Sequence, residues 1–247
     1  MTRASWSAGS GAAEVLYALG HPASFLVLAL SFVVGITLHG WVQAIVADRM
    51  GDRRPRLARR LEPQPQVHID PFGAVGALIG GLGWAHPVEL GGRRDRARTI
   101  AVALAGPLVN IVLGLALLVL YRGTLATGPS EGLAAFFADQ GAGYALQHGG
   151  SLAGDVLGYA VLLAGASQLY LGVLSLVPLP PLDGGRLLFA LAPRTLGWQR
   201  AEHYLVEQNI GVAVVLLLLL LPLGGRLLLL QVLDSVLAPL LGLVLGV

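Results

Sequence analysis

Long uncharged apolar runs, rather than alternating patterns, dominate the first two thirds of this chain. Residues 25–47, 100–121 and 156–182 contain no formally charged side chain. A helix needs about 20 apolar residues to cross a hydrocarbon core of roughly 30 Å. These three runs therefore predict three transmembrane helices.

Two further apolar runs lie near the C-terminus. Residues 208–225 are mostly Leu and Val until Pro222 interrupts them, and residues 226–247 contain Arg226 and Asp234. An ionisable residue is costly inside a bilayer, so the last run is the weaker signal. We expect one or two additional C-terminal transmembrane helices.

The whole chain is predicted to form one domain. No internal repeat, low-complexity segment or linker divides the sequence. We therefore expect a single all-α, polytopic membrane domain over 1–247, with its core at 25–190 and its C-terminal helices at 205–247.

The stretch 71–88 is also uncharged, yet its composition differs from that of the runs above. It is rich in Gly and begins and ends near Pro, which makes it poor helix material. Arg-rich segments flank it on both sides, so it is expected to enter and leave on one side of the membrane. Because irregular backbone at membrane depth must be covered by protein or line a wet cavity, we interpret it as a re-entrant or hairpin element that lines a site.

Two other segments are predicted from local signals. Residues 130–147 are expected to form a short interfacial helix capped by Ser130. The first 20 residues lack the basic start and long apolar core of a cleaved signal peptide, so we expect the first span to be retained.

Composition supports a membrane bundle over a soluble domain. The chain is 55% hydrophobic and 12% charged, with a mean hydropathy of +0.73, whereas a soluble domain is usually about a quarter charged. It contains no Cys, which excludes disulfides and Cys-based zinc sites. The net charge is +2 and every basic residue other than His is Arg, but the Arg residues cluster beside the apolar runs. We therefore expect the lipid bilayer, and not nucleic acid, as the partner.

The placement of Arg also predicts orientation, because basic loops stay in the cytoplasm. Residues 49–60 hold six Arg and residues 93–98 hold four, whereas residues 122–155 hold one. We expect a multi-pass protein of the plasma membrane with loops 49–60 and 93–98 in the cytoplasm, and with residues 122–155 and the N-terminus outside.

His39 and Gln43 are the first candidate functional residues. Both fall in the last third of the first predicted span, one helical turn apart and on one helical face. Either the two side chains hydrogen-bond to each other inside the helix bundle, or they belong to a functional site.

Asp183 is the second candidate. It follows the third run directly, after three Pro residues between 178 and 181 and before two Gly residues. This composition predicts an extended, turn-forming segment that brings a carboxylate near membrane depth, where it must be paired, coordinated or hydrated. A salt bridge with Arg186 is the alternative.

Four weaker candidates complete the set. Asn110 is polar within the second run and is suited to a helix–helix hydrogen bond. His68, Asp70 and His86 bracket the stretch 71–88, where interfacial His and Asp are ordinarily solvated or cap helices.

Taken in order, these segments resemble the site-2 protease family of intramembrane zinc metalloproteases. The resemblance rests on five motifs and covers about residues 30–190. They are ADRMGD at 47–52, HIDPFG at 68–73, GWAHPV at 83–88, AGPLVN at 105–110 and PLPPLDGGRL at 178–187.

The resemblance implies a three-helix catalytic core. Its first helix would carry HExxH, in which two His residues bind zinc and the Glu acts as general base, and an aspartate after the third helix would be the third zinc ligand. His39 and Asp183 match two of the ligand positions, and Asn110 matches the core-helix asparagine.

The motif departs from the family at two positions. Gly40 stands where the family has its catalytic Glu, and Gln43 stands where it has the second zinc His. Gly cannot accept a proton, and a neutral amide is a poor exchange for imidazole at zinc. Ser175 also replaces a frequent Asn. We therefore expect no intact catalytic set and either no cofactor or weakly bound zinc.

Three functions remain open at this point. The first is a pseudoprotease that binds a membrane helix or partner protein without cutting it. The second is an active, divergent intramembrane zinc metallopeptidase, in which His68 or His86 replaces the missing ligand and Asp70 acts as base. The third is a transporter or channel that uses the intramembrane polar residues.

Overall fold

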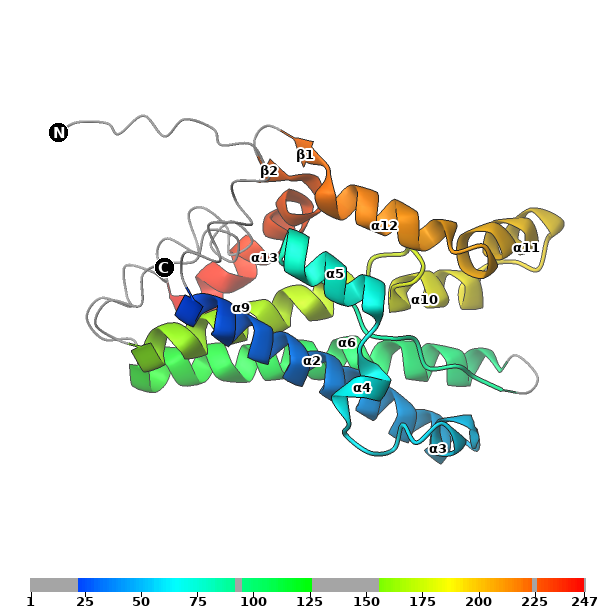
Figure 1. The fold of residues 1–247 in the computed structure, drawn as a ribbon, viewed down its shortest axis with the longest axis horizontal. Helices are drawn as coiled ribbons and strands as arrows, with labels where there is room; N and C mark the ends of the chain where they lie inside the picture. The colour runs from blue at the N-terminus through cyan, green and yellow to red at the C-terminus, as the bar shows by residue number, and fades with distance from the viewer. Residues whose placement is uncertain (1–21, 92–94, 126–155, 224–225, 247) are drawn as a thin grey trace.

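The protein is all-helical apart from one short hairpin, as a computed structural model shows for residues 22–91, 95–125, 156–223 and 226–246. Three long helices form the core: α2 (Pro22–Arg49), α6 (Arg96–Leu120) and α9 (Val156–Ser175). They lie side by side along the long axis of the molecule (Figure 1). The first three predicted spans are thus confirmed as helices.

Close backbone approach holds α6 against α9. A Cβ atom added at Gly114 of α6 would lie 2.8 Å from the carbonyl oxygen of Gly165 and 2.8 Å from the nitrogen of Leu169. Small residues at such a crossing let two membrane helices pack by van der Waals contact, the main attraction available within lipid.

The third predicted span is shorter than expected. α9 ends at Ser175, because the prolines that follow cannot continue a helix. The chain then turns and re-forms helix at α10 (Asp183–Leu191). Asp183 therefore begins a helix, whereas the sequence predicted an extended turn for it.

The Gly-rich stretch is half helical, contrary to the expectation that it would be irregular. α5 (Pro71–Gly80) starts with Asp70 as its N-cap, whose carboxylate accepts from the Gly73 N–H. Gly73, Gly76 and Gly80 face Trp84 and Leu219, and added side chains would collide with them. Packing of the bare face against its neighbours thus overrides the low helix propensity of Gly.

A hairpin-like return follows α5, as predicted for this stretch. Residues 81–90 run back without helix, and an antiparallel bridge joins Ile69 to Ala85. Two short helices precede α5, and both contact α2: α3 (Arg54–Leu57) and α4 (Pro65–His68).

The C-terminal part breaks up more than the apolar runs predicted. The α11–η2 segment, α11 (Leu196–Glu202) with η2 (His203–Glu207), bends by 69° from α12 (Ile210–Leu220). The strands β1 (Pro222–Leu223) and β2 (Arg226–Leu227) form a hairpin that an all-α prediction did not include.

The last element, α13 (Leu228–Leu245), packs against α6 and α9. Its Asp234 accepts a hydrogen bond from the Tyr170 hydroxyl, which partners this intramembrane carboxylate. The weaker of the two C-terminal runs is therefore a full helix.

Four described helices are long and apolar enough to span a membrane, and the bent pair of α11–η2 with α12 would make a fifth. The chain is thus an all-α polytopic membrane protein. α3, the start of α6 and α11 gather at one end of the molecule, away from the β1–β2 hairpin (Figure 1). The helix predicted at 130–147 lies outside the described residues.

Candidate functional site

The three-helix core brings His39 and Asp183 into direct contact. The Nε2 atom of His39 lies 2.7 Å from Oδ2 of Asp183, and both residues are buried. Gln43, one turn beyond His39, donates from Nε2 to Oδ1 of Asp183 at 2.8 Å. The sequence-predicted ligand positions and the altered one therefore meet at a single point.

An amide relay fixes the orientation of the His39 ring. Asn110 of α6 donates to the carbonyl oxygen of Gly35 at 3.2 Å and to Oε1 of Gln168 at 2.7 Å, so its Oδ1 faces Nδ1 of His39 at 2.8 Å. Gln168 of α9 in turn donates to the carbonyl oxygen of Ser31 at 2.7 Å. The carbonyl oxygens of Gly35 and Ser31 thus determine which end of the Asn110 and Gln168 amides carries the donating NH₂ group.

This orientation determines where the ring carries hydrogen. Because Oδ1 of Asn110 can only accept, Nδ1 of His39 must donate, and Nε2 is the atom left to face Asp183. A metal-binding His is oriented in the same way, with its second ring nitrogen donating to a supporting group.

The donor set nevertheless does not fit a catalytic zinc ion. Such a site has three protein ligands and an open position. Here the NH₂ group of Gln43 donates to Asp183 at 2.8 Å and lies 3.3 Å from Nε2 of His39, so it presents hydrogens where a metal ligand would present a lone pair. Within the described residues, no three His, Cys, Asp or Glu side chains come together to hold a metal ion.

His68 fills the space that a side chain at position 40 would need. A Cβ atom added to Gly40 would lie 2.5 Å from Nδ1 of His68 and 3.1 Å from its Cγ. The His68 ring is fully buried, and its Nε2 faces the carbonyl oxygen of Glu62 at 3.1 Å. Its Nδ1 has no hydrogen-bond partner in the described residues.

The environment of His68 favours its neutral form. Burial lowers the pKa of His68, outweighing the hydrogen bond to Glu62, and the positive charge of Arg60 lowers it further. Nε2 then carries the hydrogen that Glu62 accepts, and Nδ1 presents a lone pair toward Gly40. The imidazole thus occupies the space beside Gly40 that a side chain at this position would enter, although it does not complete a metal-ligating trio with His39 and Asp183.

Asp70 and His86 lie apart from this point and serve local structure. Nδ1 of His86 is 3.4 Å from Oδ2 of Asp70, and His86 is exposed. Burial acts to raise the pKa of Asp70, but hydrogen bonds from His86 and the Gly73 N–H outweigh it, so this pKa lies below its ordinary value. The structure therefore gives Asp70 a capping role and leaves His86 at the surface.

Arg186 connects the centre to the extended segment 81–90. Its Nη1 lies 3.6 Å from Oδ1 of Asp183, and its Nη2 donates to the Val88 carbonyl oxygen. Arg60 donates to the neighbouring carbonyls of His86 and Pro87. The salt bridge considered from sequence is thus present, alongside the contacts with His39 and Gln43.

Three participants were not identified from sequence. Gln168 and Ser31 are single polar residues within apolar helices, a weak signal that the sequence did contain. Gly106 of α6 has no such signal: a side chain there would collide with the His39 ring, which only the packed helices reveal. Ser175, in contrast, bonds only within α9, to the Leu171 carbonyl oxygen at 2.7 Å.

Comparisons with known proteins agree with this architecture. The family model of peptidase family M50 matches residues 27–221. A relative from Bacillus subtilis (strain 168), described as "Putative zinc metalloprotease YwhC", is 31% identical over 207 residues, which cover 80% of this chain and 82% of the relative. No solved structure is similar enough to count as a match.

Proposed function

Since this chain belongs to peptidase family M50, the site-2 protease family, we propose that it is a non-proteolytic member, a pseudoprotease that holds a transmembrane helix of a partner protein without cutting it. The observation that carries the proposal is the closed hydrogen-bond set at His39, Gln43 and Asp183. In this set an amide NH₂ group donates where a zinc ion would bind.

The missing base weakens hydrolysis independently of the metal. A positioned general base contributes typically 10²–10⁴-fold to a rate, and Gly40 supplies no group for that role. The His68 ring occupies the adjacent volume, so a water molecule has less room beside Gly40. The two changes fall in one motif and act on one step, the activation of water.

The rest of the scaffold supports retained binding. The three helices α2, α6 and α9 still pack as a core, and the Asn110–Gln168 relay still orients His39. A buried polar network is costly when partly satisfied, and this one is almost fully satisfied. The family resemblance then suggests a membrane helix as the partner. We place the protein in the plasma membrane, with loops 49–60 and 93–98 in the cytoplasm.

One observation favours the second candidate, an active but divergent zinc metallopeptidase. His39 and Asp183 both survive, and the lone pair of His68 lies beside Gly40. Under this candidate, chelators abolish cleavage of a helical substrate and Asp183→Ala has the same effect.

Recovery of bound helices from intact membranes separates the two candidates. After crosslinking, helices that copurify with the protein are expected at full length, and zinc in the purified protein is expected well below one per chain. Recovery of partners as two fragments with one common cut site, lost in Asp183→Ala, would contradict the pseudoprotease proposal.

A further inference from the structure

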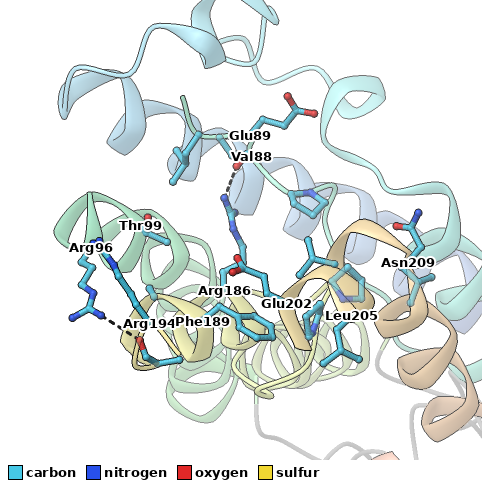
Figure 2. Close-up of a pocket in the computed structure, with 18 residues that line it drawn as sticks. Val88, Glu89, Arg96, Thr99, Arg186, Phe189, Arg194, Glu202, Leu205 and Asn209 are labelled. Atoms are coloured by element: carbon cyan, nitrogen blue, oxygen red, sulfur yellow. Dashed lines mark hydrogen bonds between the residues drawn. The ribbon is translucent and has the colours of Figure 1, made fainter. Parts of the chain in front are cut away.

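A cavity lined by part of α10 adjoins the His39–Asp183 centre through Arg186. Its volume is about 450 Å³, within the range of ligand-binding pockets. The extended segment 87–90, the start of α6, α10 and the α11–η2 segment enclose it. Figure 2 shows Arg186 crossing this space from α10 to the Val88 carbonyl oxygen.

The cavity lies at the level where the apolar helices end. α6 begins at Arg96, α9 ends at Ser175 and α12 begins at Ile210, and residues at or near the first and last of these points line the cavity. The α11–η2 segment turns 69° away from α12 and covers one side. The ends of apolar membrane-spanning helices lie near the headgroup region of a bilayer.

The charges in the cavity lining favour an anion. Three guanidinium groups, from Arg96, Arg186 and Arg194, face two carboxylates, from Glu89 and Glu202. Asp183 faces Arg186 from the centre at 3.6 Å and offsets the remaining positive charge. What favours an anion is that Arg96 and Arg194 form no ion pair within the described residues. Basic pockets between helix ends bind anionic lipid headgroups in this way.

The N–H groups of these three guanidinium groups are only partly hydrogen-bonded within the described chain. Arg194 is exposed and makes no hydrogen bond or ion pair with the part of the chain that the structure describes. Arg96 makes a single side-chain hydrogen bond, to the Ala192 carbonyl oxygen at 3.2 Å. The Nη1 of Arg186 has no hydrogen-bond partner, since Asp183 is 3.6 Å away.

Apolar walls adjoin this positive side of the cavity. Phe189 of α10, Leu205 and Val206 of η2, and Val212 of α12 line it, and Phe189 and Leu205 point into the same space as Arg186 (Figure 2). A free phosphate ion would leave these walls in contact with water. A phospholipid would cover them with its glycerol and the first methylenes of its acyl chains.

We propose that this cavity is a binding site for one anionic phospholipid, whose phosphodiester contacts Arg96, Arg186 and Arg194. Arg186 also faces Asp183, so the bound lipid would adjoin the degenerate centre through one side chain. The proposal does not depend on whether the centre is proteolytic.

Native mass spectrometry of the full-length, delipidated protein in a neutral detergent tests the site. We expect one bound dioleoyl phosphatidylglycerol per chain, retained in preference to dioleoyl phosphatidylcholine. Arg194→Gln should weaken binding about fivefold, and Arg96→Gln with Arg194→Gln about 25-fold, from the typical contribution of each Arg near a membrane surface. Arg200→Gln is the matched control, because Arg200 is exposed on α11 outside the cavity, and it should bind as the wild type does.

Three results would overturn the proposal. Equal retention of the two lipids would remove the role of net charge. Unchanged binding in the double variant would place the lipid elsewhere on the surface. Complete displacement of phosphatidylglycerol by millimolar inorganic phosphate would show a site for the free ion. Because Arg194 is exposed and makes no hydrogen bond or ion pair within the described chain, the Arg194→Gln variant tests binding without disturbing the fold.

Discussion

At the scale of single residues, position 43 decides what the centre can hold. Nε2 of His39 and the carboxylate of Asp183 are both oriented toward one point, but the Gln43 NH₂ group donates into it. An imidazole there would offer a lone pair instead of a hydrogen. The chemical character of this one side chain thus separates a hydrogen-bonded cluster from a metal site.

We predict that Gln43→His raises the zinc content of the purified protein from well below one toward one per chain. The third protein ligand that a structural or catalytic zinc requires would then be present. Elemental analysis after dialysis measures the change. The variant Gln43→His with Asp183→Asn is the control, and it should return zinc to the wild-type level. Stoichiometric, chelator-resistant zinc in the wild type would contradict the prediction.

At position 40, the ring of His68 occupies the space that a side chain would need. Since an added Cβ would lie 2.5 Å from Nδ1 of the buried His68, we expect Gly40→Ala to lower the free energy of unfolding by about 1–3 kcal/mol, the usual cost of overpacking. Denaturant titration in detergent measures this. Combining Gly40→Ala with His68→Ala should remove most of the additional cost.

Gly197→Ala is the matched control for that cycle, because a Cβ there meets no atom within 4 Å. It should be neutral or slightly stabilising. Additive effects of Gly40→Ala and His68→Ala would show that the two side chains do not compete. The contact also implies that Glu at position 40 restores a base only if His68 is made smaller in the same variant.

At the scale of elements, the amide relay joins the three core helices. Asn110 of α6 bonds to Gly35 and His39 of α2 and to Gln168 of α9. Each bond lies where the helices meet and no water reaches. The relay therefore contributes both to helix packing and to the orientation of the His39 ring.

We predict that Asn110→Ala is destabilising by roughly 1–3 kcal/mol, because it leaves buried groups on two other helices without a partner. The free energy of unfolding in detergent is the measurement. Ser175→Ala serves as the control, since its hydroxyl bonds only to the Leu171 carbonyl within α9. Equal effects of the two substitutions would argue against a relay that links the helices.

At the scale of the whole molecule, the position of the Arg-rich segments predicts how the protein is oriented in the membrane. The Arg-rich segment around α3 and the start of α6 lie at one end of the bundle, together with α11 (Figure 1). This grouping is what the positive-inside rule requires of a cytoplasmic face.

Single-cysteine labelling can read this orientation directly, because the chain has no native Cys. Leu57 is 82% exposed, and a Cβ at Gly123 meets no atom within 4 Å. In intact cells, a membrane-impermeant maleimide should label Gly123→Cys and should label Leu57→Cys only after the membrane is opened. The reverse pattern would invert the topology.

The sequence alone determined the class of fold and the identity of the core helices. Uncharged apolar runs long enough to cross a bilayer fold as membrane-spanning helices, so α2, α6 and α9 follow from composition. The order of the motifs indicated the family, and the departures at Gly40 and Gln43 could be read directly from the sequence.

Tertiary structure decided the rest, because it depends on which surfaces meet. The glycines of α5 form a helix only since Trp84 and Leu219 cover their bare face. The amides of Asn110 and Gln168 gain a direction only from backbone carbonyls on another helix. The sequence left His68 and His86 equivalent. Packing buries one beside Gly40 and leaves the other at the surface, since side-chain contacts between distant segments are not encoded in local pattern.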